Sequence, residues 1–492
     1  MRLEVEQVDM ETNAPIVIMN ERDAEELGVN PLDRVQISRD GEEVVGIVDI
    51  TEEMVDKGKL GVTDRLSYLE GEIGISTASK PDSVRHVKEK LDDEELEKED
   101  LEEIVEDINE NRLNDVEMGA YVTGIYTNGL SLEETRHLTE AMTEIGEVIE
   151  WHDGIIADKH SIGGVAGNRV TPVVVPIVAA AGLKIPKTSS RAITSPAGTA
   201  DTMEVFADVE FSVEEIKEIV NETNGCVVWG GSVNLSPVDD KIIRAEHPLS
   251  LDPEGQVIAS VLSKKKSAGS THAVIDIPYG EGSKVDNLTD ARDLARKFKR
   301  VGDHIDMEIE CTITTGGEPI GRGIGPVLEA RDVLRVLQGE GPEDLKLKSL
   351  RLASILFDLA GIDVEPREIL ESGEALEKFR EIVEAQNGDP EVELGDLQPG
   401  EHTATVKAGR DGFVTHISNE LVSDIARRAG APKDTKAGIE LQAKVGDQVE
   451  EGDELLTVYA EKEEKLEEAE ELAEETEAVR VRGKEASLVE RV

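Results

Sequence analysis

The stretch from Asp158 to Asp201 contains residue types whose spacing could hold an anion. Within it five basic residues stand against two acidic ones, a local charge of +3, whereas the whole chain has a formal net charge of −54. A basic segment in so acidic a chain predicts a binding site for a negatively charged ligand. The basic residues are Lys159, Arg169, Lys184, Lys187 and Arg191.

Glycine and hydroxyl residues in the same stretch fit a phosphate group. Glycines let backbone N–H groups approach a ligand closely, and serine and threonine donate hydrogen bonds to phosphate oxygens. The apolar run that starts at Val173 predicts a helix, and the positive end of that helix would point toward an anion. The glycines are Gly163, Gly164 and Gly167, and the hydroxyl residues are Ser161, Ser189, Ser190 and Thr199.

These residues also have interpretations that involve no phosphate. A GGxxG pattern alone is usually a tight turn, and the hydroxyl residues of 188–199 could form a solvated loop. A P-loop is excluded because GxxxxGK[ST] is absent, and a dinucleotide loop is disfavoured because Lys-His-Ser, rather than an apolar strand, precedes the glycines. The combination of charge, glycines and hydroxyls favours an anion site.

The elements that must position these residues have both helical and strand periodicity. Ala273–Ile277 and Met307–Ile313 look like buried strands with helices between them, which predicts an α/β sheet. A helical spacing of apolar residues, from Leu101 to Ile108, precedes the basic stretch. A helical pattern is found again after that stretch. We therefore expect a multidomain α/β protein with a discontinuous helical lobe (86–150 and 236–268) and an α/β phosphate-binding domain (151–235 and 269–400).

Both ends of the chain are expected to form smaller modules. Residues 1–80 alternate apolar and polar residues between turn signals, which predicts a small N-terminal β-barrel. Within 401–461, KVGDQVEEGDELLTVYAEKE resembles the barrel-sandwich fold of lipoyl and biotinyl domains. It has no lysine at a matching hairpin tip, so we expect a structural C-terminal barrel-sandwich module. The charged sequence of residues 462–492 predicts a helix followed by a disordered tail.

Composition limits the partners and the compartment. The chain has 492 residues with 107 acidic and 53 basic side chains, a balance that repels nucleic acid and anionic membranes. We expect a folded protein adapted to high salt, with a mesophilic acidic enzyme as the alternative. Cys226 and Cys311 in apolar sequence, and an N-terminus without an apolar signal region, favour the cytoplasm. The apolar stretch Val170–Leu183 is too short and interrupted to span a bilayer.

Motifs within about residues 86–460 resemble the thymidine/pyrimidine nucleoside phosphorylase family. KHSIGGV, PIVAAAG and SSRAITSPAGTADTME follow in the family's order, together with SLEETRHLTEAM, NLSPVDDKIIRAE and ASVLSKKKSAG. The chain departs from the nucleoside enzymes at residues 190–202, where they carry a glycine-rich segment, and in its added first 80 residues. Both departures resemble the archaeal branch of the family, the AMP phosphorylases, and the composition would suit a halophilic archaeon.

The resemblance implies roles for individual residues. Asp252 is implied to protonate the departing base, which requires burial or a neighbouring charge to raise its pKa; the alternative is a turn cap before Pro253. His160 is either a phosphate or substrate contact or a structural histidine, and Lys265 and Lys266 are either part of the site or a solvated helix face. Phosphate binding is implied for Lys159, His160, Ser161, Ser189 and Thr199, and substrate binding for Gly164, Ser190, Arg191, Ala192, Ile193, Thr194, Ser195, Thr199, Arg244, Ser260, Lys264 and Lys284.

The implied reaction is phosphorolysis of AMP, and of CMP and UMP, to the free base and ribose 1,5-bisphosphate. Cleavage builds positive charge on the ribose, so phosphate must be held below C1′ and the base must leave protonated. Inorganic phosphate is then a co-substrate, and no metal or other cofactor is implied. We expect a homo-oligomer in which the N-terminal barrel serves assembly.

Three alternative functions remain open at this point. A nucleoside phosphorylase for thymidine or uridine is the nearest, although the hydroxyl-rich 188–199 loop favours a substrate with a 5′-phosphate. A phosphoribosyltransferase such as anthranilate phosphoribosyltransferase has the same expected architecture. It would need paired acids to hold magnesium pyrophosphate, and no such motif stands out. A non-catalytic assembly protein is the third.

Overall fold

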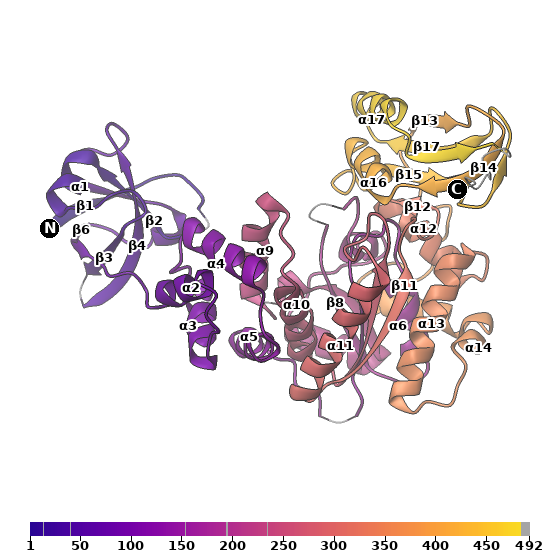
Figure 1. The fold of residues 1–492 in the computed structure, drawn as a ribbon, viewed down its shortest axis with the longest axis horizontal. Helices are drawn as coiled ribbons and strands as arrows, with labels where there is room; N and C mark the ends of the chain where they lie inside the picture. The colour runs from indigo at the N-terminus through magenta and orange to yellow at the C-terminus, as the bar shows by residue number, and fades with distance from the viewer. Residues whose placement is uncertain (13, 40, 153, 193–194, 234, 484–492) are drawn as a thin grey trace, which may run out of the picture. The chain divides into compact units, whose positions relative to one another are not determined.

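A computed structural model describes residues 1–12, 14–39, 41–152, 154–192, 195–233 and 235–483 (Figure 1). The chain divides into two compact units, of which the first is Met1–Ile145 with Ser236–Ser260 and the second is Gly146–Leu235 with Val261–Val492. Because the chain leaves the first unit and returns to it, the first unit is discontinuous in sequence. The division falls inside helix α10 (Glu254–Ser267), so residues 261–268, which we expected in the helical lobe, group with the second unit.

The N-terminal barrel, drawn in indigo in Figure 1, forms from strands whose apolar residues alternate with polar ones. The apolar side chains make its core, and Val17, Val35 and Ile37 are among those that are fully buried. The barrel predicted for residues 1–80 is thus confirmed. Its strands are β1 (Arg2–Gln7), β2 (Ile16–Asn20), β3 (Arg34–Arg39), β4 (Glu42–Thr51), β5 (Lys59–Val62) and β6 (Glu72–Thr77), closed in the order β1-β5-β2-β4-β3-β6, with helix α1 (Glu21–Leu27) and the 3-10 turn η1 (Asp64–Leu66).

Amphipathic helices complete the first unit. Ser131 and Glu134 form the capping box predicted from sequence, since each side chain accepts a hydrogen bond from the other residue's backbone N–H, at 2.7 and 3.2 Å. Leu101 and Ile104 lie in the core, as their spacing predicted. The helices are α2 (Ser83–Leu91), α3 (Lys98–Asn109), α4 (Asp115–Asn128), α5 (Leu132–Ile145), α9 (Pro237–Glu246), the 3-10 turn η3 (His247–Leu249) and the first part of α10.

One buried arginine links the barrel to the helices of this unit. Arg34 of β3 is 4% exposed, and its guanidinium donates to the Arg112 carbonyl oxygen at 3.0 Å and to Glu117 Oε1 at 3.1 Å. Glu117 lies in the first turn of α4, where its other oxygen also pairs with Arg34. A planar guanidinium that binds a carboxylate with two nitrogens fixes orientation as well as distance.

The second unit is built on parallel strands in the order β11-β10-β7, next to a parallel pair β8-β9. A parallel bridge between Ile156 and Lys184 joins the two sets just before β7 and β8 begin. The strands predicted at Ala273–Ile277 and Met307–Ile313 are confirmed as β10 and β11. The strands are β7 (Ala157–Ser161), β8 (Ile185–Ser189), β9 (Gly225–Trp229), β10 (His272–Tyr279) and β11 (Glu308–Thr315).

Helices pack around this sheet and bury the main core of the unit. α6 (Thr171–Ala180) is the helix predicted from the apolar run at Val173, and its residues through Ala179 are buried. Their apolar side chains pack with those of α13 and α15. The other elements are α7 (Thr199–Met203), α8 (Val213–Thr223), the 3-10 turn η2 (Gly230–Ser232), α11 (Leu288–His304), β12 (Gly323–Ile324), α12 (Pro326–Leu337), α13 (Glu343–Ala360), α14 (Pro366–Glu371) and α15 (Glu374–Ala385).

The C-terminal part of the second unit has two small sheets, β12-β15-β17-β13 and β16-β14-β18. One expectation was wrong here, because the charged helix is followed by strand β18 rather than by disorder: Val479 and Val481 are buried, and β18 pairs with β14. Residues 484–492 lie outside the described part of the chain. The elements are β13 (His402–Lys407), β14 (Gly412–Ile417), α16 (Asn419–Arg428), β15 (Gly438–Leu441), β16 (Gln448–Val449), β17 (Glu454–Ala460), α17 (Glu463–Glu475) and β18 (Val479–Arg482).

The length and hydropathy of the described helices differ from those of membrane-spanning helices. Among the described residues, every helix is too short or too polar to cross a bilayer.

Candidate active site

Two of the expected phosphate ligands end neighbouring strands of the second unit. Ser161 is the last residue of β7 and Ser189 is the last residue of β8. The bridge between Ile156 and Lys184 sets the two strands side by side and parallel, so both serines lie at the carboxyl edge of the sheet. This edge is where ligands bind in open α/β sheets.

Lys159 lies two residues before the end of β7 and is 3% exposed. Its ammonium donates a hydrogen bond to Thr171 Oγ1 at 3.0 Å, and Thr171 is the first residue of α6. Burial lowers the pKa of Lys159 to about 7, although the nearby Asp276 carboxylate acts in the opposite direction. An anion bound beside Lys159 would supply the negative charge that its surroundings lack.

The Asp276 carboxylate, fully buried in β10, joins three segments of the chain. Ser161 Oγ donates to Asp276 Oδ2 at 2.7 Å, and Thr314 Oγ1 donates to Oδ1 at 2.6 Å. The Lys348 ammonium of α13 lies 2.8 Å from Oδ2, and its side chain is 9% exposed. The charge of Lys348 also lowers the pKa of Lys159.

Asp158, Lys265 and Lys187 form a second buried ionic group. Asp158 Oδ2 pairs with Lys265 Nζ at 2.9 Å, and Lys187 Nζ lies 3.9 Å from Oδ1. Burial, with the charge of Lys265, holds the pKa of Lys187 well below its usual range. The same two causes hold the pKa of His160 well below its usual range, so the imidazole is neutral. Lys265 is 2% exposed, so its interpretation as part of a solvated helix face was wrong.

The glycines of the 163–167 loop allow the backbone to pack tightly. Gly164 has φ of +101°, and a Cβ there would lie 2.7 Å from the backbone nitrogen of Lys284. The same nitrogen donates to the Gly163 carbonyl oxygen at 3.4 Å. The structure therefore brings together Gly164 and Lys284, which are 120 residues apart in sequence and were both expected at the site.

Asp201, which sequence reasoning did not select, holds two of the described residues of the 190–199 loop. One Asp201 oxygen accepts the backbone N–H groups of Ala192 and Gly198, both at 2.7 Å. The Ser189 Oγ is buried without a hydrogen-bond partner among the described residues, and the Ser195 hydroxyl donates to the Ala197 carbonyl oxygen at 3.1 Å. Ser190 is exposed, whereas Ile193 and Thr194 lie outside the described residues.

Arg191, expected among the substrate-binding residues, has a side chain that is held by neighbouring acids. Its guanidinium pairs with Glu204 and Glu210, and lies 5.0 Å from the centre of the Trp229 ring. These acidic partners raise its pKa above its already high value. Arg191 thus fastens the loop to neighbouring acids, and its charge is already compensated.

A second arginine, Arg169, contacts the 190–199 loop from outside it. It donates to Thr199 Oγ1 at 3.1 Å and to the Ala197 carbonyl oxygen at 2.8 Å. It also pairs with Glu329 of α12, whose pKa burial raises and Arg169 lowers. Because Thr199 accepts from Arg169, its own hydroxyl proton is available to donate to an anion.

The remaining expected residues lie on α9, η3 and α10. Arg244 of α9 is exposed, Ser260 of α10 is partly buried, and both belong to the first unit. Lys264, also partly buried, lies one helical turn further along α10 in the second unit. Asp252, between η3 and α10 in the first unit, is exposed, so the burial that a proton donor would use is not found there.

Two residues of this region, Asp276 and Lys348, were not selected from the sequence. Asp276 could have been noticed, because an acid within the apolar strand text AVIDIP needs a buried partner. Lys348 follows an ordinary helical pattern and gives no signal of its own. Its role appears only when α13 packs against β10.

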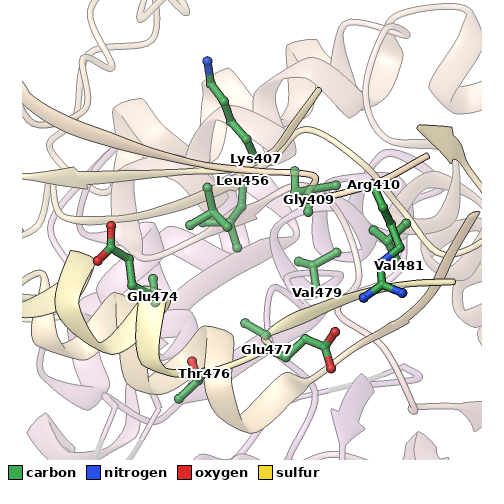
Figure 2. A pocket seen from close by; sticks show the side chains of 13 residues that line it. Lys407, Gly409, Arg410, Leu456, Glu474, Thr476, Glu477, Val479 and Val481 are labelled. Carbon is green, nitrogen blue, oxygen red and sulfur yellow. The ribbon is translucent and has the colours of Figure 1, made fainter. Parts of the chain in front are cut away.

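Two other features of the described residues could hold a ligand. A hollow of about 290 Å³ in the C-terminal part of the second unit is lined by apolar residues and by Lys407, Arg410, Glu474 and Glu477 (Figure 2). It includes none of the expected site residues. A possible metal-binding group, His86 with Glu89 and Asp100, lies in the first unit.

Models of known families match three parts of the chain. Residues 84–146 match the glycosyl transferase family helical bundle domain, residues 153–250 the α/β domain of that family, and residues 413–479 the pyrimidine nucleoside phosphorylase C-terminal domain. The solved structure of anthranilate phosphoribosyltransferase from Thermus thermophilus is similar in fold, with a TM-score of 0.53 and 19% identity over 61% of this chain and 99% of that one. These matches define the class of fold as a helical bundle joined to a glycosyl transferase α/β domain.

Relatives with full-length similarity define the family more closely. The AMP phosphorylase of Natronomonas pharaonis is 58% identical, with 100% of each chain covered. AMP phosphorylase 1 of Archaeoglobus fulgidus is 48% identical over 93% of each chain, and the AMP phosphorylase of Thermococcus kodakarensis is 46% identical over 98% of each. The chain belongs to the AMP phosphorylase family, which confirms the resemblance inferred from its motifs.

Proposed function

We propose that the protein cleaves AMP with inorganic phosphate, giving adenine and ribose 1,5-bisphosphate. The observation that carries this proposal is the buried Lys159, whose ammonium donates to Thr171 at the start of α6 and whose pKa is lowered to about 7. Full-length relatives named AMP phosphorylase support the same substrate. CMP and UMP are included in the proposal as further substrates, since they share the ribose 5-phosphate group.

In this proposal the attacking phosphate is held by hydroxyls and cations of the second unit. Ser161, Ser189 and Thr199 donate to its oxygens, while Lys159 provides the opposite charge. His160, which is neutral, can contact the phosphate or substrate without adding charge. Because these buried groups are already oriented, the phosphate that they hold can attack C1′ with little reorganisation, and this accounts for a large part of the barrier reduction in such a transfer.

The nucleotide is proposed to bind along the glycine loop and the 190–199 loop. Gly164, Lys284 and the residues Ser190–Ser195 would contact the ribose 5-phosphate. Arg191 would do so through its backbone N–H, because its side chain is held by acids. Arg244, Ser260 and Lys264 are proposed to contact the nucleotide on the base side. Asp252 is proposed to deliver the proton to the departing base, which must not leave as an anion.

The remaining parts of the proposal concern the setting of the reaction. Inorganic phosphate is a co-substrate, and the proposal includes no cofactor. We further propose a cytoplasmic homo-oligomer in which residues 1–80 serve assembly rather than chemistry. Removal of these residues, with Glu117→Gln to avoid an unpaired buried carboxylate, should then change the particle size measured by light scattering, and an unchanged size would contradict the role in assembly.

A substrate panel tests the proposed reaction. The protein is incubated in high-salt buffer with AMP, CMP, UMP, adenosine, uridine or thymidine, with and without phosphate, and released base is measured by chromatography. We expect adenine from AMP only when phosphate is present, and faster than from adenosine. Faster cleavage of uridine or thymidine would favour a nucleoside phosphorylase. Release of base from a nucleotide by magnesium pyrophosphate but not by phosphate, with phosphoribosyl pyrophosphate as the other product, would favour a phosphoribosyltransferase. No product at all would favour a non-catalytic role.

A lysine pair provides the matched control for the site. Lys159→Ala should remove most activity and weaken phosphate binding, because it deletes the buried cation. Lys184→Ala removes a lysine from the same stretch, but this one bonds to Asn221 at the surface, 2.6 Å away, and should leave activity unchanged. Near wild-type turnover and phosphate affinity in Lys159→Ala would contradict the assignment.

A further inference from the structure

Helices α2 and α3 of the first unit each present a pair of potential ligands to a common point. His86 and Glu89 are three residues apart on α2, and Asp100 and Glu103 are three residues apart on α3. Residues with this spacing lie on the same face of a helix. The two helices pack against each other, so the four side chains meet between them.

The ring nitrogens of His86 have different surroundings. Nδ1 lies 2.9 Å from Glu89 Oε2 and 3.1 Å from Asp100 Oδ1, while Nε2 lies 3.0 Å from Glu103 Oε2. The His86 side chain is 3% exposed, whereas those of Glu89 and Asp100 are 32% and 25% exposed. A buried imidazole thus faces two carboxylates that remain accessible from solvent.

These separations match those between the ligands of one metal ion. Bonds of about 2.0–2.2 Å from a metal to nitrogen and oxygen put adjacent ligand atoms roughly 3 Å apart. The ligand atoms of His86, Glu89 and Asp100 all lie within 4.8 Å of one another. Glu103 would then have a different task, since a metal-bound histidine commonly donates its other N–H to a carboxylate that fixes the ring.

Charge favours a divalent cation at this point. Glu89, Asp100 and Glu103 bring three negative charges around one imidazole. The Arg85 guanidinium lies beside this group, with Nε 3.6 Å from Glu89 Oε1 and Nη2 3.4 Å from His86 Nε2. The Arg85 side chain is 70% exposed and compensates only part of this charge. A divalent ion bound to His86 Nδ1 would balance the remainder.

We propose that His86 Nδ1, Glu89 and Asp100 bind a divalent transition-metal ion, with Glu103 orienting the imidazole. An imidazole with carboxylates suits Zn²⁺ or Mn²⁺ better than Ca²⁺, which takes oxygen ligands. The site joins α2 to α3 and is separate from the residues proposed for phosphorolysis. It would therefore strengthen the packing of the helices rather than take part in bond cleavage.

Calorimetric titration of the purified, chelator-treated full chain with Zn²⁺ tests the site, with Ca²⁺ as a comparison ion. We expect one tight Zn²⁺ site per chain, lost in His86→Gln and Asp100→Asn. Binding in Glu103→Gln should be about 10–100-fold weaker, because only the orienting carboxylate is changed. Glu102→Gln is the control, since Glu102 pairs with Lys98, 3.4 Å away, and carries the same charge on the same helix.

A spectrum of bound Co²⁺ gives a second readout that does not depend on stability. Direct coordination by His86 should give a visible ligand-field spectrum in the wild type and in Glu102→Gln but not in His86→Gln. Equal Zn²⁺ binding in wild type and His86→Gln would show only general attraction to an acidic surface and would overturn the proposal. Absence of a tight site in the wild type would overturn it as well. If His86→Gln fails to fold, Asp100→Asn and Glu103→Gln still decide the matter.

Discussion

Ser161 donates its only hydroxyl hydrogen to the buried carboxylate of Asp276, with 2.7 Å between the two oxygens. In the proposed reaction that hydrogen must turn from Asp276 to a phosphate oxygen. After the Ser161 hydroxyl has rotated, the Asp276 carboxylate would still have a hydrogen bond from Thr314 and an ion pair with Lys348. Asp276 is therefore proposed as a positioning residue that holds Ser161 and Lys348 ready for the incoming anion.

The first prediction follows from this arrangement. Asp276→Asn removes the negative charge opposite the buried Lys348, so the free energy of unfolding should fall by about 3–5 kcal/mol. The KM for phosphate should rise as well, because Ser161 loses its charged partner. Chemical denaturation and steady-state kinetics measure the two effects.

A double variant separates stability from phosphate binding. Asp276→Asn combined with Lys348→Met removes both buried charges, so it should recover most of the lost stability. Phosphate binding should remain weak, because a cation and the group that positions Ser161 are then both missing. Recovery of phosphate affinity together with stability would show that Asp276 and Lys348 serve folding alone.

The second prediction concerns pH. With a pKa of about 7, Lys159 is charged below pH 7 and neutral above it in the folded protein. Phosphate affinity should therefore fall by up to about tenfold per pH unit above 7. Lys159→Arg keeps its charge at these pH values and should flatten the profile. A pH profile of KM for phosphate that is identical in the two proteins would exclude Lys159 as the titrating cation.

The same pKa shift links Lys159 to stability. An unfolded chain holds the Lys159 proton up to about pH 10, so between about pH 7 and 10 it binds more protons than the folded protein. This group's contribution to stability therefore rises with pH across that window. Lys159→Met should melt at a higher temperature than the wild type at pH 7, and the difference should shrink as the pH approaches 10.

The third prediction concerns Asp252. Asparagine can form a turn hydrogen bond before Pro253 but cannot deliver a proton. If Asp252 is the proton donor, Asp252→Asn should lower turnover about 10²-fold or more while AMP binding is mostly kept. Turnover and AMP affinity are to be measured on the same preparation. Unchanged turnover would assign Asp252 to the turn alone and leave the proposed phosphorolysis intact.

The fourth prediction concerns salt. With a net charge of −54, the acidic side chains of the folded protein repel one another. Salt screens this repulsion less when it is dilute, because the Debye length grows from about 3 Å at 1 M salt to about 10 Å at 0.1 M. We expect the melting temperature to fall as salt is removed. Calorimetric melts in chloride salts from 0.1 to 3 M (roughly the range over which screening changes) measure this, and a constant melting temperature would rule out salt adaptation.

Residue periodicity and type alone determined much of this protein. Alternation in the first 80 residues predicted the barrel, the spacing of Leu101 and Ile104 predicted a buried helix face, and the apolar run at Val173 predicted α6. These features could be predicted because they depend on neighbours a few positions away. Lys159 and Ser161 were also selected from sequence, since charge and hydroxyl type are visible without a fold.

Only the tertiary structure decided which distant residues meet. Asp276 and Lys348 come from β10 and α13, and nothing in local sequence sets the 2.8 Å between them. The burial of Lys265 against Asp158 and the pairing of β18 with β14 likewise depend on packing across long stretches of chain. Local sequence patterns indicate which face of a helix or strand is apolar. The partner of a buried polar group is decided only when elements that are far apart in sequence pack together.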